Sequence, residues 1–205
     1  MASGSKRIAV IGLNANSVPL LLGNYNGEPS RPVTILEGIK RVAGADVEVN
    51  YLPGCPLVLR KGESDGQAKK MIEDATAAAK SADVVIYVGG ISPDLEGEEF
   101  GGVSLYDGFS GGDRSRIELP PVQEDLIRAL HGTGKPVVFV NCSGSAVAMP
   151  WQAENLPAIL QAWYPGEQGG RAVGDILFGD ANPSAGCRSR FTKRPPICLT
   201  LKNTR

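Results

Sequence analysis

The side chains best suited to acid–base chemistry are gathered in one stretch of the chain, from Asp83 to Arg114. It opens with Val84–Val88, a nearly continuous β-branched run that is typical of a buried parallel strand. Gly89 and Gly90 then end the strand. A long loop without periodicity follows, and loops of this kind in compact domains usually have a function. Ligands of open α/β sheets bind beyond the carboxyl ends of strands, so the stretch predicts a working carboxylate there. The candidates are Asp94, Glu96, Glu98, Glu99 and Asp107.

The elements that must position this loop alternate along the chain. Strands are predicted at Arg7–Gly12, Asp46–Tyr51, Val84–Val88, Lys135–Asn141 and Pro157–Trp163, and helices at 33–42, 67–80, 119–130, 145–151 and 170–178. This order predicts an α/β fold, a mostly parallel β-sheet with helices on both faces, which is a three-layer α/β/α sandwich. In the helix that begins near Leu119, Gln123 is expected to face water. Trp163 ends an apolar run and is expected to lie in the core.

Composition excludes several classes of function. The 205 residues suit one domain with a core of its own, and the net charge of −1 favours neither nucleic acid nor an acidic membrane surface. No apolar run approaches the ~20 residues of a membrane span. No signal peptide is recognised, so we expect a cytoplasmic location on expression, and residues 1–5 read as a leader or a disordered terminus. Four scattered cysteines and one histidine are poor zinc-site material.

Two other activities are considered. The turn after the first strand, G-x-N-A-N, lacks the G-x-G-x-x-G fingerprint of a dinucleotide site. Ser143 and Ser145 follow a strand and precede a helix, as an esterase nucleophile does, but G-x-S-x-G is absent and only His131 is available as a base. A non-catalytic module that binds sugar or a protein partner is a further alternative. Nothing in the sequence indicates a metal, flavin or nucleotide cofactor.

Several collinear motifs resemble the C-terminal α/β sandwich domain of glycoside hydrolase family 3 enzymes, which include β-glucosidases and β-xylosidases. The matching stretches are I-A-V-I-G-x-N-A-N (8–16), G-N-Y-N-G (23–27), V-G-G-I-S-P-D-L-E-G-E-E (88–99), G-G-D-R (111–114), L-P-x-x-Q (119–123), G-K-P-V-V (134–138), A-W-Y-P-G-E-x-G-G (162–170) and L-F-G-D-x-N-P-S (177–184). Together they cover nearly all of residues 6–184, the extent predicted for the domain.

The resemblance implies a retaining exo-acting β-glycosidase that cleaves β-linked gluco- or xylo-oligosaccharides with two carboxylates. The family's nucleophile lies on an N-terminal (β/α)₈ barrel, and its acid/base glutamate matches Glu96. Glu98 and Asp107 stay open as alternatives because residues 98–111 lengthen the loop before G-D-R. Asp113 and Arg114 are candidate substrate-binding residues, although a local structural role is the preferred interpretation.

A barrel alone needs about 250 residues, and no S-D-W nucleophile motif is present. We therefore expect little glycosidase activity from this chain by itself. The surface that meets the barrel is expected to be apolar and to favour self-association.

The tail carries a separate expectation. After N-P-S the family continues as G-R-L-P-V-T-F-Y-K, whereas this chain reads A-G-C-R-S-R-F-T-K. Codons GGC TGC CGG TCA CGT TTT ACA AAA from Gly186 onward, read one base earlier, become CGG CTG CCG GTC ACG TTT TAC AAA, which encodes R-L-P-V-T-F-Y-K. Residues 185–205 are therefore predicted to be a non-native tail produced by a frameshift.

Overall fold

The computed structural model describes residues 6–96, 105–110 and 113–183. Within these residues the main sheet has five parallel strands in the order β2-β1-β3-β6-β7. They are β1 (Arg7–Ile11), β2 (Glu48–Leu52), β3 (Val84–Gly90), β6 (Val137–Cys142) and β7 (Ala158–Gln161). The order is that of doubly wound sheets: β2 is added on one side of β1, and the later strands are added on the other side, beginning with β3. The predicted fold class is confirmed.

Burial of each strand follows its place in the sheet. All seven residues of the central strand β3 are buried, in line with its β-branched run. The edge strand β2 alternates between exposed and half-buried residues, as its sequence predicts.

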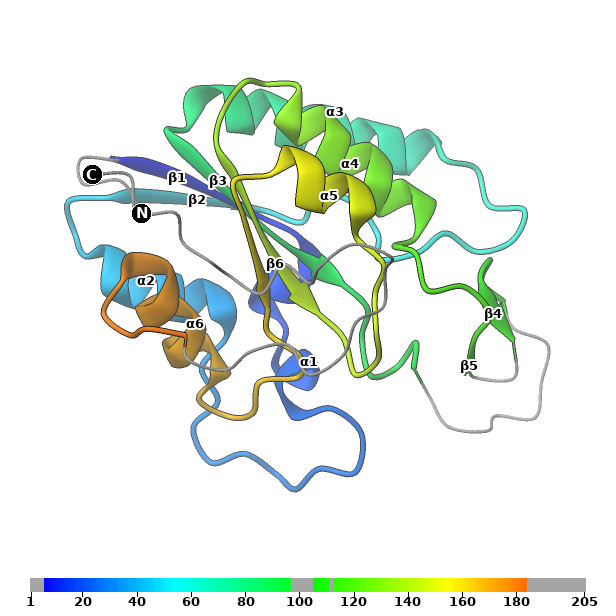
Figure 1. The fold of residues 1–205 in the computed structure, drawn as a ribbon, viewed down its shortest axis with the longest axis horizontal. Coiled ribbons are helices and arrows are strands. Elements are labelled where there is room, and N and C mark those ends of the chain that lie inside the picture. The colour runs from blue at the N-terminus through cyan, green and yellow to red at the C-terminus, as the bar shows by residue number, and fades with distance from the viewer. Residues whose placement is uncertain (1–5, 97–104, 111–112, 184–205) are drawn as a thin grey trace.

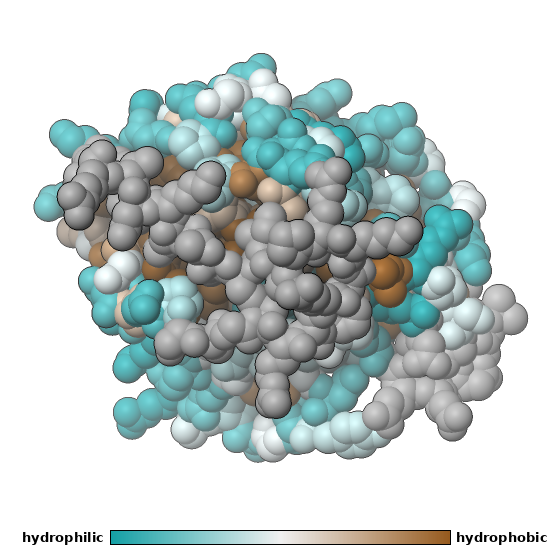
Figure 2. All heavy atoms as spheres, in the orientation of Figure 1, coloured by the Kyte–Doolittle hydropathy of each residue, from teal (hydrophilic) through white to brown (hydrophobic). Residues whose placement is uncertain are grey.

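Helices cover both faces of the sheet, and each face has its own apolar cluster (Figure 1). One face carries α3 (Gly66–Ser81), α4 (Pro121–His131) and α5 (Pro150–Asn155). The other carries α1 (Val18–Leu22), α2 (Ile35–Ala43) and α6 (Gly169–Phe178). The viewed surface is mainly hydrophilic where described residues form it, with hydrophobic atoms near its centre (Figure 2). No helix among the described residues is long and apolar enough to span a membrane.

The helix α2 shows how local sequence fixes an element. The Thr34 hydroxyl accepts from the Glu37 N–H, and the Glu37 carboxylate accepts from the Thr34 N–H, so both members of a capping box are present. A Cβ on Gly38 would lie 1.8 Å from the carbonyl oxygen of Gly170. The backbones of α2 and α6 therefore touch, and only glycine permits that approach.

Several features differ from the sequence predictions. The helix predicted at 145–151 is observed as α5 at Pro150–Asn155, and the helix α1 at Val18–Leu22 was not predicted. A short antiparallel hairpin, β4 (Phe109–Ser110) with β5 (Asp113–Arg114), lies in the stretch read as an irregular loop. Gln123 is fully buried rather than exposed. Trp163 is 51% exposed rather than in the core, because its backbone turns into the left-handed region (φ 58°) directly after β7.

Candidate active site

The predicted site lies beyond the carboxyl ends of the parallel strands, where the loops after β1, β3, β6 and β7 meet (Figure 1). Asn14, buried in the 3₁₀ turn Leu13–Asn16 after β1, donates from Nδ2 to the carbonyl oxygens of Gly89 and Ile91, at 3.1 and 3.2 Å. A Cβ on Gly12 would lie 2.0 Å from the Val88 oxygen. The loop after β1 is thus tied closely to the end of β3.

A buried glutamine braces the end of β3, from which the acidic loop departs. Oε1 of Gln123 accepts from the Tyr87 hydroxyl and the Gly90 N–H, both at 2.8 Å. Its Nε2 donates to the carbonyls of Leu57 and Gly90, both at 2.7 Å. All four bonding positions of the amide are used, which explains why a polar residue in α4 faces the sheet.

The carboxylate of Glu96 is the convergence point of the loops after β3, β6 and β7. Its Oε2 accepts from the Gly144 N–H at 2.6 Å and from the Tyr164 hydroxyl. Its Oε1 accepts from the Ser145 N–H at 3.1 Å and from the Ser145 hydroxyl. We call these four donors the Glu96 cradle. Each carboxylate oxygen thus has one backbone N–H and one hydroxyl as partners, so the side chain is held in one orientation.

Backbone features around the cradle keep its members in place. A Cβ on Gly144 would lie 2.8 Å from Cε2 of Tyr164 and 3.0 Å from Oε2 of Glu96, so a larger residue in the turn after β6 would have to displace one of these side chains. The left-handed conformation of Trp163 directs the chain into Tyr164. The backbone oxygen of Glu96 also accepts from Nδ2 of Asn24, at 3.2 Å. Asn24 precedes Tyr25, a second exposed aromatic residue with positive φ (55°).

Arg114 supports the cradle from the β4–β5 side. Its Nη1 donates to the Ser145 hydroxyl at 3.2 Å and to the Ala146 oxygen at 2.6 Å, and its Nη2 donates to the Glu118 oxygen at 3.1 Å. Burial lowers the pKa of Arg114, and the charge of Glu96 opposes that effect. Burial, with the Glu96 carboxylate beside it, raises the pKa of the Tyr164 phenol well above its usual range, so Tyr164 stays a hydrogen-bond donor.

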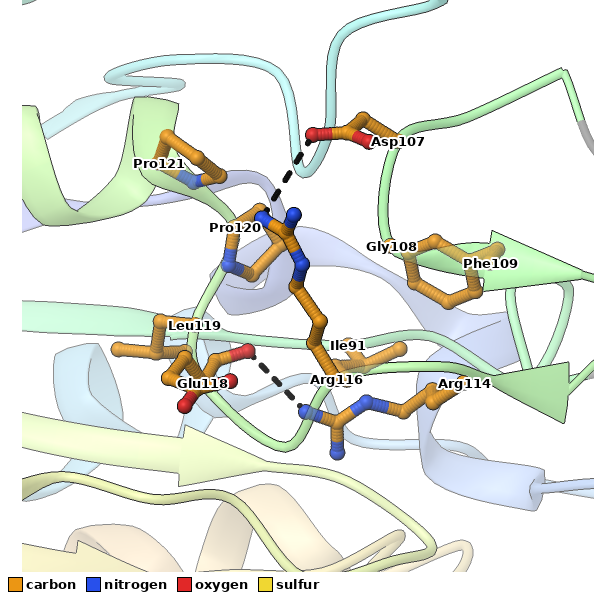
Figure 3. A pocket seen from close by; sticks show the side chains of 10 residues that line it. All are labelled: Ile91, Asp107, Gly108, Phe109, Arg114, Arg116, Glu118, Leu119, Pro120 and Pro121. Atoms are coloured by element: carbon orange, nitrogen blue, oxygen red, sulfur yellow. Dashed lines mark hydrogen bonds and ion pairs between the residues drawn. The ribbon is translucent and has the colours of Figure 1, made fainter.

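A cavity of about 330 Å³ lies between the start of α4 and the hairpin, and Arg114 forms part of its wall (Figure 3). Arg116 reaches across it to Asp107, at 3.9 Å, and both side chains are about two-thirds exposed. The remaining lining residues are Ile91, Gly108, Phe109, Glu118, Leu119, Pro120 and Pro121. The cavity lining therefore combines charged groups of both signs with an aromatic ring.

The structure places the other predicted residues as follows. Asp107 lies next to the hairpin and pairs with Arg116, and none of the four hydrogen bonds described for Glu96 involves it. Asp94 is exposed. Glu98 lies outside the described residues, and for Asp113 only the backbone is described. Arg114 is near Glu96 through Ser145.

The two serines considered for an esterase are both bonded elsewhere. Ser143 is fully buried, donates to the Ser145 oxygen at 2.7 Å and accepts from Gln161 at 3.1 Å. The Ser145 hydroxyl donates to Glu96. His131 ends α4, which leads into the opposite end of β6, and its ring packs against Trp151.

Sequence reasoning did not identify the cradle residues Gly144 and Tyr164, and it considered Ser145 only as a nucleophile. The available signal was that each follows a strand whose carboxyl end lies at the same edge as that of β3. Within the described part of the chain, no group of three or more His, Cys, Asp or Glu side chains is placed to hold a metal ion.

Comparison with known proteins gives the family. The profile described as "Glycosyl hydrolase family 3 C-terminal domain" matches residues 1–195. A β-xylosidase from Formosa agariphila is 37% identical over 194 residues, which are 92% of this chain and 24% of that protein. A xylan 1,4-β-xylosidase from Xylanibacter ruminicola is 50% identical over 121 residues, or 59% of this chain and 14% of that protein.

Solved structures agree with the sequence relatives. A β-glucosidase from Erythrobacter marinus has a TM-score of 0.74 at 35% identity, covering 88% of this chain and 25% of that one. An exo-β-xylosidase, XlnD, in complex with a xylobiose aziridine probe has a TM-score of 0.71 at 31% identity, covering 88% of this chain and 21% of that one. The chain therefore spans about a quarter of the length of these relatives. By both its sequence and its fold, this chain belongs to the glycosyl hydrolase family 3 C-terminal domain family.

Proposed function

We propose that the chain is the second domain of a retaining, exo-acting β-glycosidase, a β-xylosidase or β-glucosidase, and that Glu96 is its acid/base residue. The observation that carries the proposal is the cradle, which fixes one carboxylate beyond the carboxyl ends of the strands. A general acid must be held in one orientation against the leaving-group oxygen. Among the other described candidates, Asp94 is exposed, and Asp107 is exposed and pairs with Arg116 at 3.9 Å.

The rest of the active site is proposed to come from a (β/α)₈ barrel that carries the nucleophile. Retaining hydrolysis needs a second carboxylate ~5–5.5 Å from the first, on the other side of the glycosidic bond. The Glu96 cradle contains no second carboxylate. The relatives are about four times as long as this chain, which leaves room for such a barrel.

Exposed apolar side chains support a partner at the same edge of the sheet. Several follow strand ends or flank the hairpin, and they are 39–85% exposed: Leu13, Tyr25, Leu105, Ile117 and Trp163. We propose that this surface docks on the barrel and that it favours self-association of the chain alone. Sedimentation velocity tests the second part: a concentration-dependent dimer is expected, and a monomer at all concentrations would contradict it.

Enzyme assays test the proposal in two steps. The purified chain is expected to leave p-nitrophenyl β-xyloside and β-glucoside unhydrolysed, and turnover abolished by Glu96→Gln would contradict the need for a barrel. A two-domain enzyme is then made from the Formosa agariphila β-xylosidase by replacing its matching segment with residues 6–183 of this chain. In that two-domain enzyme, Glu96→Ala is expected to lose activity that azide restores, giving a β-glycosyl azide.

Controls in the same enzyme separate the candidate carboxylates. Asp107→Ala is expected to keep activity, since that side chain is exposed and makes none of the cradle's hydrogen bonds. Glu98→Ala tests the alternative assignment. Rescue by azide in Glu98→Ala but not in Glu96→Ala would show that Glu98 is the acid/base residue. Calorimetry of the chain with xylose, xylobiose and glucose tests the non-catalytic alternative, and sugar binding without any activity in the two-domain enzyme would favour it.

A further inference from the structure

The Glu96 cradle raises a chemical question, which rests on the acid/base role proposed above. The Glu96 carboxylate accepts four hydrogen bonds. An acid/base residue must also exist as the neutral acid, which carries a proton on one oxygen and must donate it. Backbone N–H groups cannot accept that proton. A cradle made only of N–H groups would therefore oppose the acid form.

The four donors are not equivalent in this respect. Gly144 and Ser145 each supply a fixed N–H, but Tyr164 and Ser145 also supply hydroxyls, which rotate and can accept as well as donate. Each carboxylate oxygen has one partner of each kind. Either oxygen can thus carry the proton and donate it to its own hydroxyl, while both backbone N–H bonds stay on the carboxyl group.

We propose that Tyr164 and Ser145 are positioning residues that keep Glu96 in one orientation in both of its protonation states. The catalytic proton comes from solvent to a lone pair of Glu96 that faces one of the hydroxyls, and it leaves for the departing oxygen when that oxygen takes the hydroxyl's place. Neither hydroxyl gains or loses a proton, since each only reverses its hydrogen bond. Either hydroxyl suffices, because one accepting partner satisfies one acid proton.

The surroundings fit this assignment. Tyr164 stays neutral because burial and the adjacent Glu96 raise its pKa. The Ser145 oxygen already accepts from Arg114 and keeps a second lone pair for a proton on Glu96. Among the described residues, the other titratable groups facing the cradle are Glu118, which acts on Arg114, and the Cys142 thiol, whose pKa burial raises to about 12. Asp94 lies on the same loop as Glu96 and is exposed.

Carbon-13 NMR of the 205-residue chain tests the proposal without any enzyme activity. With label at tyrosine Cζ and glutamate Cδ, the Tyr164 Cζ signal is expected to change with acid pH at the same midpoint as Glu96 Cδ. Ser145→Ala should enlarge the Tyr164 change, because Tyr164 is then the sole acceptor. Tyr51, on the far edge of the sheet, is the internal control and should not follow Glu96. The proposal would be overturned if the Tyr164 Cζ signal did not change as Glu96 titrates, or if Ser145→Ala left the size of that change unaltered.

Kinetics of the two-domain enzyme give a second readout. Tyr164→Phe and Ser145→Ala are each expected to lower kcat/KM less than about 10-fold, and the double variant by more than the product of the two losses. Tyr51→Phe is the matched control. Losses that simply multiply would overturn the shared role. If Glu96→Ala shows no azide rescue while the NMR coupling is present, the acid/base role fails and the hydrogen-bond reversal stands.

Discussion

Replacing Glu96 by glutamine is the most direct probe of the cradle, because it changes hydrogen-bonding chemistry while keeping size. The carboxylate presents two accepting oxygens, whereas an amide presents one oxygen and one NH₂ group. In either orientation the NH₂ faces a backbone N–H, that of Gly144 at 2.6 Å or that of Ser145 at 3.1 Å. The hydroxyl on that side can turn round and accept, but the N–H cannot.

The expected loss follows from that count. One backbone donor loses a charged acceptor, and a hydrogen bond to a charged group contributes ~1.5–3 kcal/mol when buried. Glu96 is only half-buried and Gly144 and Ser145 are exposed, so water replaces part of the bond. We therefore expect Glu96→Gln to lower the free energy of unfolding by about 1–2 kcal/mol. For a chain of this size that is a drop in Tm of roughly 2–8 °C.

Urea unfolding of the 205-residue chain, followed by circular dichroism, measures the loss. The midpoint should fall with little change in m-value, since the surface exposed on unfolding is unaltered. Glu28→Gln is the matched control: Glu28 is an exposed loop glutamate, and the expected change is below about 0.5 kcal/mol. A Glu96→Gln variant as stable as the control would refute the reasoning that the cradle restrains this side chain.

Further substitutions test the parts around the cradle. Gly144→Ala inserts a methyl 2.8 Å from the Tyr164 ring and should cost about 1–3 kcal/mol of unfolding free energy in the same assay; a neutral result would show that the turn adapts. Gln123→Leu leaves the Tyr87 hydroxyl, the Gly90 N–H and two carbonyls without their partner, so it should lower the free energy of unfolding by about 3–5 kcal/mol. The control is Gln67→Leu at an exposed position, which should change that free energy little. The pKa of Tyr164 is raised in the folded chain, so its stabilising contribution is complete below the pH at which an unfolded tyrosine ionises, ~10, and is lost as the pH rises past that value. Unfolding free energy measured from pH 9 to 11 should therefore fall less steeply in Tyr164→Phe than in the unaltered chain, and equal slopes would contradict the assignment. Sequencing the source DNA checks the tail: an alternate frame without R-L-P-V-T-F-Y-K near codon 186 would rule out the frameshift.

Local pattern was sufficient for the elements that depend on neighbouring residues. The β-branched run of β3 specifies structure within a few positions and is present as predicted. The Thr34–Glu37 capping box is equally local, and the structure shows it at the start of α2. Gln123 shows where this reasoning stops. A glutamine in the first turns of an amphipathic helix normally faces water. Here its amide is required by the end of β3, 33 residues away, and periodicity carries no information on such a partner.

The candidate site likewise has one part that a local pattern predicts and another that depends on residues far apart in the sequence. The strand end predicts a group of loop carboxylates, and the family resemblance singles out Glu96 among them, but the partners of Glu96 lie 48–68 residues further along the chain. Only the order of the strands brings them together. The preference for Trp163 in the core was wrong for a related reason, because hydrophobicity does not report backbone conformation. Trp163 is destabilising in two ways: its backbone is strained at φ 58°, and half of its large apolar side chain is exposed to water. Trp163 lies one residue before Tyr164, and the turn at Trp163 directs the Tyr164 hydroxyl onto Glu96. Trp163→Gly, which adopts that backbone freely, should therefore preserve the Tyr164 Cζ response to acid, whereas a change to valine, which resists positive φ, should abolish it.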